Sequence, residues 1–521
     1  MSTFSNSTQN EPECLHGLEQ QAQPSVWLRR LLWVVPILML VVALLMRLYH
    51  LDVPFDRDGY DEGVYWQSLR AMLAGQSLYH TIFYSQPPAF LLAIFPIFTL
   101  FGGSLWSARL GIALISLLGF AGAALLGKAL AGRAGMFAAL LLLLTSTLYL
   151  AESQTLQAEG PSVALTLLAL GFALLWWQQP VGRRGLCWAS LSGIALTLSI
   201  FCKLLCITTV VPIALLMLGR VWYIQNNRSG THLESWLPML VGVGLALLTS
   251  LALVLPFIGS FAAFWSSVVT FHEVAAQDLP GTLIGNAHIM RPVLFSLLGA
   301  TAGYGTLTAL VRKDWRVLPL LAWLLVTCGL LLRQYPLFPH HLVALVPPLI
   351  TLAVLGIAEP SSYKILLANT HLAKIVPFVT VLAMLLILLT ASLDVWQDSS
   401  YYLSADAASA SAGTQLDLRA ASDLRQAITP AQWVITDGQF IAGLADRSTP
   451  PALVDTSNVR IATGYVTLAQ LEQAVSQPRV HAVLFYTGRF SLPKTADFHA
   501  WVAQRFHLIH TYNPGQELWV R

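Results

Sequence analysis

The sequence predicts an all-α, polytopic membrane domain followed by a small C-terminal α/β domain. Hydrophobic residues make up 56% of the 521 residues and charged residues only 11%, whereas a soluble domain carries about 25% charged residues. Apolar segments long enough to span a bilayer recur up to about residue 393. Beyond Asp394 the apolar content falls and short alternating segments appear, which is typical of a domain outside the bilayer.

The chain begins with a polar stretch, residues 1–28, that has no apolar periodicity and predicts a disordered cytoplasmic tail. Arg29 and Arg30 then precede an apolar run from Leu31 to about Tyr49. This run is too long for the apolar part of a signal peptide and lacks a small-residue cleavage site, so we interpret it as an uncleaved anchor.

About eleven transmembrane helices are expected within a membrane domain of residues 29–393. The apolar runs lie near 31–49, 107–131, 136–151, 161–178, 187–201, 204–220, 236–258, 292–311, 317–332, 341–358 and 374–392. Residues 52–106 form the first external loop. Within it, the apolar segment Ala89–Phe101 contains Pro96 and is short for a span, so we expect an amphipathic juxtamembrane helix there.

Basic residues predict the orientation of the chain in the membrane. If Arg29 and Arg30 are cytoplasmic, alternation of the spans places every tight basic pair of the membrane domain on the same side. The opposite side keeps only isolated cations, which are Arg57, Arg70, Arg109, Lys203, Arg291 and Arg333. We therefore expect a multi-pass protein of the cytoplasmic membrane with its N-terminus inside and its C-terminal domain outside.

The C-terminal domain, residues 394–521, is predicted to be a small α/β unit. Trp433–Thr436, Val480–Phe485 and Gln516–Val520 have the composition of strands, and residues 467–475 and 496–506 that of helices. A domain of this size can fold alone, and it carries no catalytic motif. The net charge of +3 gives no reason to expect a nucleic-acid partner, and the five cysteines have no metal-ligand spacing.

The first external loop concentrates acidic residues next to the first apolar run. The five acids within a dozen residues are Asp52, Asp56, Asp58, Asp61 and Glu62. Charges beside a membrane helix are costly unless they face water or a cavity, so they indicate a functional site. Asp61 and Glu62 open a predicted amphipathic helix with Tyr65, Leu69, Met72 and Leu73 at helical spacing. We interpret Asp52, Asp56 and Asp58 as solvated loop acids.

Other polar residues are expected on the same side of the membrane: Glu159, Lys203, Arg333, His340 and His341. A carboxylate among them can accept the proton of an attacking hydroxyl, and the cations can stabilise a departing phosphate. A donor linked to a lipid phosphate would meet such a site from within the bilayer. Adjacent histidines do not share a helix face, so at most one of His340 and His341 is expected to point inward.

Three motifs in the first loop carry a family resemblance. They are Tyr-Asp-Glu-Gly-Val-Tyr at 60–65, Tyr-Ser-Gln-Pro-Pro at 84–88, and Phe-Gly-Gly-Ser followed by Ala-Arg-Leu at 101–110. Together they resemble the N-terminal signature of glycosyltransferase family 39-type membrane enzymes. These are GT-C-fold relatives of dolichyl-phosphate-mannose protein mannosyltransferases and bacterial lipid A aminoarabinose transferases. The similarity covers about residues 30–350 in arrangement and is specific mainly in residues 59–110.

The resemblance implies roles for four residues. Asp61 and Glu62 match the family's Asp-Glu pair, whose Asp is the expected catalytic base. Glu159 stands where relatives carry a second acid, and Lys203 where many bacterial members have a lysine after the fifth span. Gln86 departs from the family's Lys-Pro-Pro. The C-terminal domain does not resemble the sugar-binding modules of eukaryotic relatives, so no protein acceptor is implied.

The resulting hypothesis is an inverting glycosyl transfer from a polyprenyl-phosphate sugar to a hydroxyl of an extracytoplasmic glycan, lipid or protein. Asp61 is the base, and Glu62 and Glu159 orient the acceptor or a cation. The further substrate-binding candidates are Arg109, Lys203, Arg333, His340 and Gln86. No cofactor is required by a tight ligand motif, and a divalent metal held by Glu62, Glu159 or His340 is left open.

Plainer interpretations exist for each candidate. Asp61, Glu62 and Glu159 could be favourable charges in first helical turns, Lys203 could reach to the membrane interface, and Arg333 could be an interfacial anchor. The whole chain could instead be a lipid or sugar transporter or flippase, although it lacks an internal repeat. A third alternative is a catalytically silent membrane anchor for the C-terminal domain.

Overall fold

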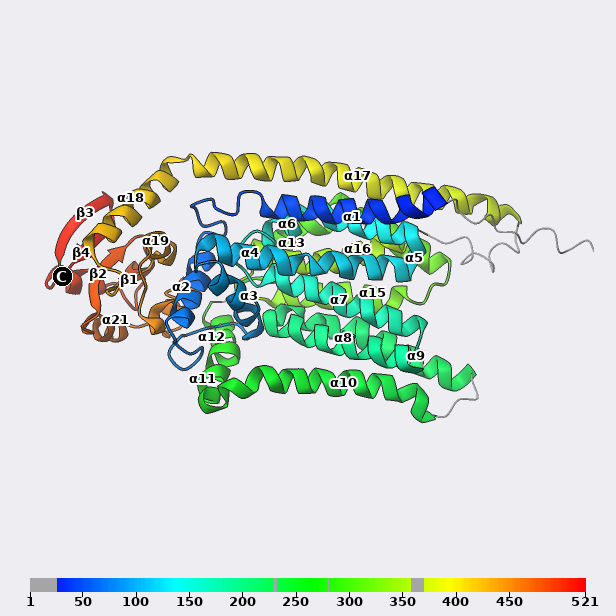
Figure 1. The fold of residues 1–521 in the computed structure, drawn as a ribbon, viewed down its shortest axis with the longest axis horizontal. Coiled ribbons are helices and arrows are strands. Elements are labelled where there is room, and N and C mark those ends of the chain that lie inside the picture. The colour runs from blue at the N-terminus through cyan, green and yellow to red at the C-terminus, as the bar shows by residue number, and fades with distance from the viewer. Residues whose placement is uncertain (1–25, 181, 228–231, 280, 358–369) are drawn as a thin grey trace, which may run out of the picture.

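The computed structural model describes residues 26–180, 182–227, 232–279, 281–357 and 370–521. They form an elongated bundle of roughly parallel and antiparallel helices, with the C-terminal domain at one end (Figure 1). The predicted tail lies almost wholly outside the described residues. The mixed architecture, a helical membrane domain followed by a small domain with a sheet, confirms the predicted fold class.

The bundle is built from long apolar helices and their short extensions. Their bounds are α1 (Val26–Leu48), α4 (Leu105–Ser116), α5 (Leu118–Leu144), α6 (Thr147–Glu152), α7 (Glu159–Gln178), α8 (Gly182–Cys202), η2 (Leu204–Thr209), α9 (Val210–Asn227), α10 (His232–Val254), α13 (Leu283–Leu294), α14 (Leu297–Val311), α15 (Val317–Arg333), η5 (Pro339–Leu345), α16 (Val346–Val354) and α17 (Thr370–Ser409).

Six helices of the described chain are long and apolar enough to cross a membrane, or seven if the bent pair α13 and α14 is one span. Shorter apolar helices at Val34–Leu48, Val317–Arg333 and Pro339–Val354 coincide with three more of the expected spans. Each of the eleven predicted spans therefore has an apolar helix at its position, and the second and third of them share the long segment Leu105–Leu144.

One long helix contains two of the predicted spans. Ala131 and Gly132 leave helical geometry inside α5, and a Cβ on Gly127 would overlap the carbonyl oxygen of Gly135. Residues eight apart in a straight helix would be about 12 Å apart. The chain therefore reverses at Gly132, whose φ of +61° suits glycine, and the two halves of α5 pack as a tight helical hairpin.

Hydrogen bonds identify one end of the bundle. The carbonyl of Ala129 accepts from the Gln178 side chain at 3.0 Å and from Arg316 at 3.2 Å. The turns that follow Ala129 and Gln178 thus share an end with the start of α15. The opposite end carries short helices that do not belong to the bundle itself: α2 (Asp61–Leu73), α3 (Ala89–Leu100), α11 (Phe261–Trp265) and α12 (Phe271–Asp278) (Figure 1). The last two were not predicted from the sequence.

The C-terminal domain contains a mixed four-stranded sheet in the order β1-β2-β4-β3. The three predicted strands are β1 (Trp433–Thr436), β2 (Val480–Phe485) and β4 (Gln516–Val520), and β1 pairs with β2 in parallel. The sheet is covered by α18 (Ala412–Ala427) and α19 (Gln439–Leu444) in one apolar cluster and by α21 (Leu468–Val475) and α22 (Phe498–Ala503) in the other. A short helix, α20 (Asn458–Ala462), precedes α21.

One strand and the end of one helix differ from the predictions. Strand β3 (His507–Asn513) was not predicted, because Leu508 and Ile509 are both exposed and the strand lacks alternating burial. Helix α17 continues through Asp394 to Ser409, so the change of composition lies inside a helix. The apolar half of α17 packs on the bundle and its polar half leads to α18 (Figure 1).

Candidate functional site

A cavity of about 700 Å³ lies where the first loop, the helix ends and the C-terminal domain meet. Each of the three regions supplies polar side chains to its wall. The charged and imidazole residues that line it are Arg57, Asp58, Asp61, Glu152, Lys203, His272, Arg333, His340, His341, Asp455 and Arg489. The predicted candidates Asp61, Lys203, Arg333, His340 and Gln86 are thus brought together in one hollow.

Asp61 is the first residue of α2 and lines this cavity. Its position is fixed by the preceding Tyr60, whose hydroxyl accepts a hydrogen bond from the backbone N–H of Thr456 at 2.8 Å. Burial and the negative charge of Asp58 raise the pKa of Asp61 to about 7, although the charges of His340 and Lys203 act in the opposite direction. A carboxylate with such a pKa is suited to accept a proton near neutral pH.

Asp58 is not a solvated loop acid, contrary to the prediction. Its Oδ1 lies 2.8 Å from Nδ1 of His340, and the side chain is only 16% exposed. Asp56 is half-buried as well, and its Oδ1 accepts from the backbone N–H groups of Asp58 and Gly59. Asp52 remains exposed. The interpretation failed because the partner of Asp58 lies 282 residues away in the chain.

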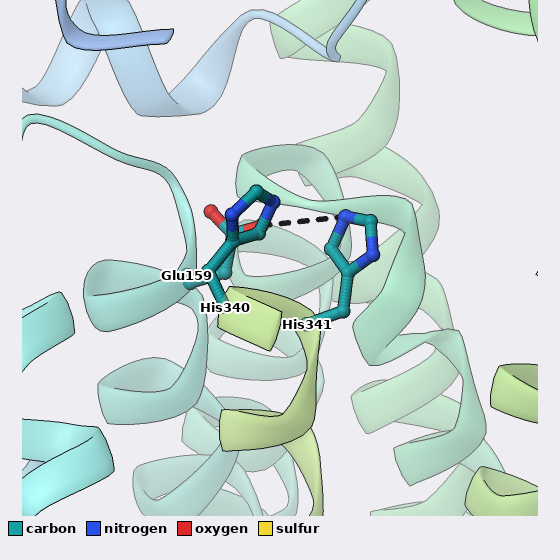
Figure 2. A group of neighbouring side chains, drawn as sticks. All are labelled: Glu159, His340 and His341. Carbon is teal, nitrogen blue, oxygen red and sulfur yellow. Dashed lines mark ion pairs between the residues drawn. The ribbon is translucent and has the colours of Figure 1, made fainter. Parts of the chain in front are cut away.

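Three side chains, those of Lys203, His340 and His341, lie within 4 Å of one carboxylate oxygen of Glu159. This oxygen, Oε1, lies 2.8 Å from Nζ of Lys203, 3.8 Å from Nε2 of His340 and 3.9 Å from Nε2 of His341. Figure 2 shows both imidazole rings beside the carboxylate. The expectation that at most one histidine points inward is therefore wrong, because the pair lies at the start of the 3₁₀ helix η5 behind Pro339, where helical face spacing does not apply.

Glu159, His340 and His341 are also the described residues that could hold a divalent cation, since their ligand atoms lie within 4.8 Å of one another. Carboxylate and imidazole ligands suit Zn²⁺. The proposed third ligand, Glu62, is not part of this group. Of the metal candidates that the sequence left open, Glu159 and His340 therefore belong to this group, and His341 joins them.

Glu62 and Arg109 form a fully buried ion pair that does not line the cavity. Arg109 donates from Nε to Oε1 at 2.9 Å and from Nη2 to Oε2 at 2.6 Å. It also donates to the carbonyl oxygens of Leu51, Val53 and Phe55. Glu62 further accepts from the backbone N–H groups of Arg57 and Leu156, each at 2.7 Å. The pair therefore joins the first loop to α4 and lies outside the lining of the cavity.

Arg333 connects the cavity to a second hollow. This apolar groove of about 560 Å³ is lined by Ile207, Thr208, Val211, Val326, Gly329, Leu330 and Arg333. It runs between the η2–α9 segment and α15. Arg333 is exposed and forms no ion pair within the described part of the chain, so its charge is available at the mouth of both hollows.

The C-terminal domain contributes residues that were not predicted from the sequence. Asp455, Asn458 and Arg489 line the cavity, and the guanidinium of Arg489 lies 3.7 Å from the centre of the Tyr60 ring. His272 of α12 lines it too, with Nε2 at 2.8 Å from the carbonyl oxygen of Ser85. No local motif marks these four residues, because α12 and the C-terminal domain reach the cavity only through tertiary packing.

Known proteins share the fold of this chain. A family model described as dolichyl-phosphate-mannose-protein mannosyltransferase matches residues 85–259. ArnT from Cupriavidus metallidurans in the apo state superposes with a TM-score of 0.60 at 16% identity, covering 94% of this chain and 98% of that chain. ArnT bound to undecaprenyl phosphate gives 0.59 at 15% identity, covering 95% and 98%. No curated protein matches the chain by sequence.

The chain has the GT-C fold. The fold that the first-loop motifs implied is thereby confirmed, over nearly the whole length of the chain. This GT-C-fold protein is a multi-pass membrane protein, given its apolar helices and its structural neighbours. Its polar cavity lies between the bundle and the C-terminal domain.

Proposed function

We propose that this chain is a membrane glycosyltransferase that moves a sugar from a polyprenyl-phosphate donor to an acceptor hydroxyl, with inversion at the sugar's anomeric carbon. One observation carries the proposal. A single cavity contains a carboxylate with a pKa near neutrality, Asp61, together with the cations Lys203 and Arg333, and it opens onto an apolar groove. A base, a phosphate site and a lipid site are thereby adjacent.

The apolar groove supports a lipid-linked donor. Its wall carries one charged residue, Arg333, at the end that it shares with the cavity. A polyprenyl chain lying between α9 and α15 would place its phosphate at Arg333, within the cavity that also contains Lys203. Arg suits phosphate through its bidentate fork and Lys as a point charge. Undecaprenyl phosphate is the ligand in one of the similar ArnT structures.

The transfer follows from these placements. Asp61 accepts the proton of the acceptor hydroxyl, whose oxygen attacks the anomeric carbon from the side opposite the phosphate. The bond between that carbon and the phosphate oxygen breaks, and the phosphate leaves with the electron pair. Lys203 and Arg333 stabilise the charge that develops on the leaving oxygen. A single displacement of this kind inverts the configuration.

The acceptor would enter from the side of the C-terminal domain. Arg489 packs on Tyr60, the residue before the proposed base, and Asp455 and Asn458 line the same part of the cavity wall. The donor phosphate and the acceptor thus reach Asp61 from different regions of the chain. With the orientation that the basic residues predict, this cavity faces the outside of the cytoplasmic membrane.

The test is a donor panel in nanodiscs. Purified protein is incubated with several polyprenyl-phosphate sugars and candidate acceptors, and free polyprenyl phosphate and glycosylated product are quantified. We expect product with at least one donor, and a loss of about 10²–10⁴-fold in rate for Asp61→Asn.

Asp52→Asn serves as the matched control, because Asp52 is an exposed acid of the same loop; it should retain the wild-type rate. Lipid flipping without any glycosyl product would instead support a transporter. Turnover that is unchanged in Asp61→Asn would contradict the proposal.

A further inference from the structure

Glu159, His340 and His341 offer the ligand types of a divalent cation site. The side chain of Lys203, however, already places a positive charge beside Glu159. Lys203 directs its ammonium to Oε1 of Glu159 at 2.8 Å, whereas the two imidazole Nε2 atoms stand 3.8 and 3.9 Å from the same oxygen. Both members of the Lys203–Glu159 pair are buried, with side chains 10% and 2% exposed. The ammonium is thus the direct partner of the carboxylate.

Hydrogen bonds at Nδ1 fix the orientation of both imidazole rings. His340 is held through Nδ1 by Asp58 at 2.8 Å, which leaves Nε2 directed toward Glu159; this is the orientation that a carboxylate gives a metal-binding imidazole. His341 accepts a hydrogen bond at Nδ1 from the backbone N–H of Phe338 at 3.2 Å. This leaves Nε2 of His341 on the side of Glu159, at 3.9 Å from Oε1.

A divalent cation bound to this oxygen would consequently have to displace the ammonium of Lys203. Repulsion by a charge this close is strong in a buried site, so the wild-type chain does not fit a metal here. We infer that the Lys203 ammonium is a built-in replacement for a divalent cation at Glu159, and that its removal creates a metal site from Glu159, His340 and His341. Only the use of this positive charge, to stabilise the leaving phosphate, rests on the proposed function.

The position of Lys203 explains how a side chain can take this place. It lies directly after α8 ends at Cys202 and before η2 begins at Leu204, with its backbone extended at φ −149° and ψ 122°. The break lets the side chain leave the helix and turn toward the first turn of α7, where Glu159 is the first residue. Two helices that pack side by side thus bring the pair together.

The test measures metal binding without any substrate. Untagged wild type, Lys203→Ala and Lys203→Met are treated with EDTA, titrated with Zn²⁺ alone by calorimetry, and analysed for bound metal after dialysis. We expect no stoichiometric Zn²⁺ on the wild type and about one per chain on the Lys203 variants, lost again when Glu159→Gln is added. The apolar Met variant fills the space of the lysine and guards against a folding defect in the Ala variant.

Two results would overturn the inference. One is stoichiometric Zn²⁺ on the wild type that disappears in Glu159→Gln, since the ammonium then does not exclude a metal. The other is the absence of binding by the Lys203 variants, since the three ligands then form no cation position. Both outcomes are independent of glycosyl transfer, so failure of the proposed function is distinguished by the separate donor-panel assay.

Discussion

Asp61 owes its proposed role to its neighbours as much as to its own position in the loop. Burial and Asp58 raise its pKa, while His340 and Lys203 lower it, and the balance lies at about 7. The sequence marked Asp61 through the Asp-Glu motif. It could not predict this balance, because Asp58 gains its partner His340 only when distant segments meet.

A pH profile follows from that pKa. Asp61 must be ionised to accept a proton, so kcat/KM should fall about tenfold per pH unit below pH 7 and level off above it. Lys203→Met removes a charge that favours the ionised form, so the acidic limb should move to higher pH in this variant. The measurement is kcat/KM of both proteins in nanodiscs across this range. A flat wild-type profile, or a limb that moves to lower pH in Lys203→Met, would contradict the assignment of Asp61.

Glu62 shows that a motif can mark a residue without predicting its surroundings. It was expected beside substrate, but it is fully buried against Arg109. Both residues were found because they belong to the first-loop motifs. Their true environment depends on carbonyl groups of the loop that turn toward Arg109, which no pattern of side chains predicts.

Glu62→Gln should therefore act mainly on stability. Removing one partner of a buried ion pair leaves an uncompensated charge and costs about 3–5 kcal/mol, which would appear as a lower melting temperature in nanodiscs. Arg70→Gln is the matched control, since Arg70 pairs with Asp446, which is 65% exposed, and such pairs are worth about 0–1 kcal/mol. A Glu62→Gln protein with the wild-type melting temperature and no activity would instead favour direct catalysis by Glu62.

At the scale of elements, the long apolar helices were predictable and the short ones around the cavity were only partly so. The amphipathic helix α2 and the apolar helix α3 were expected from spacing and length. Helices α11 and α12 were not, because the apolar and polar residues of 261–278 show no clear period, and a π-helical turn, Ser266–Thr270, separates the two. His272 was missed for this reason.

Contact between α2 and α19 joins the C-terminal domain to the first loop. A Cβ on Gly63 would overlap the backbone nitrogen of Phe440, so Gly63→Ala must push α19 away. We expect a loss of about 1–3 kcal/mol in stability, faster proteolysis of the C-terminal domain and lower activity. Gly303→Ala, where a Cβ meets no atom within 4 Å, should leave all three unchanged. Equal behaviour of the two variants would mean that the close contact is not required.

For the whole molecule, the sequence predicted a membrane domain, an external loop with the site and a separate C-terminal domain. It did not predict that the C-terminal domain closes the site. Gln67 donates to the carbonyl of Arg447 at 3.0 Å and accepts from the N–H of Thr449, so a buried polar contact joins two regions about 380 residues apart. Composition indicates that a less apolar domain follows the membrane helices, but carries no information about the surface on which it packs.

The apolar groove offers a test of the lipid path. Gly329 lines it, and a Cβ on this residue would meet no atom within 4 Å, so Gly329→Leu should fill the groove without a clash. We expect a several-fold higher KM for a long-chain polyprenyl donor and an unchanged KM for a donor with one or two isoprene units. Gly303→Leu, outside the groove, is the control. An equal effect on long and short donors would place the lipid elsewhere.

The central claim is that a lipid phosphate is held beside Asp61 by Lys203 and Arg333. Cryo-electron microscopy of the chain in nanodiscs with polyprenyl phosphate tests it most directly. We predict density for the phosphate between Lys203 and Arg333 and for the chain between α9 and α15. Phosphate density away from both cations, or a lipid bound at the opposite end of the bundle, would contradict the account.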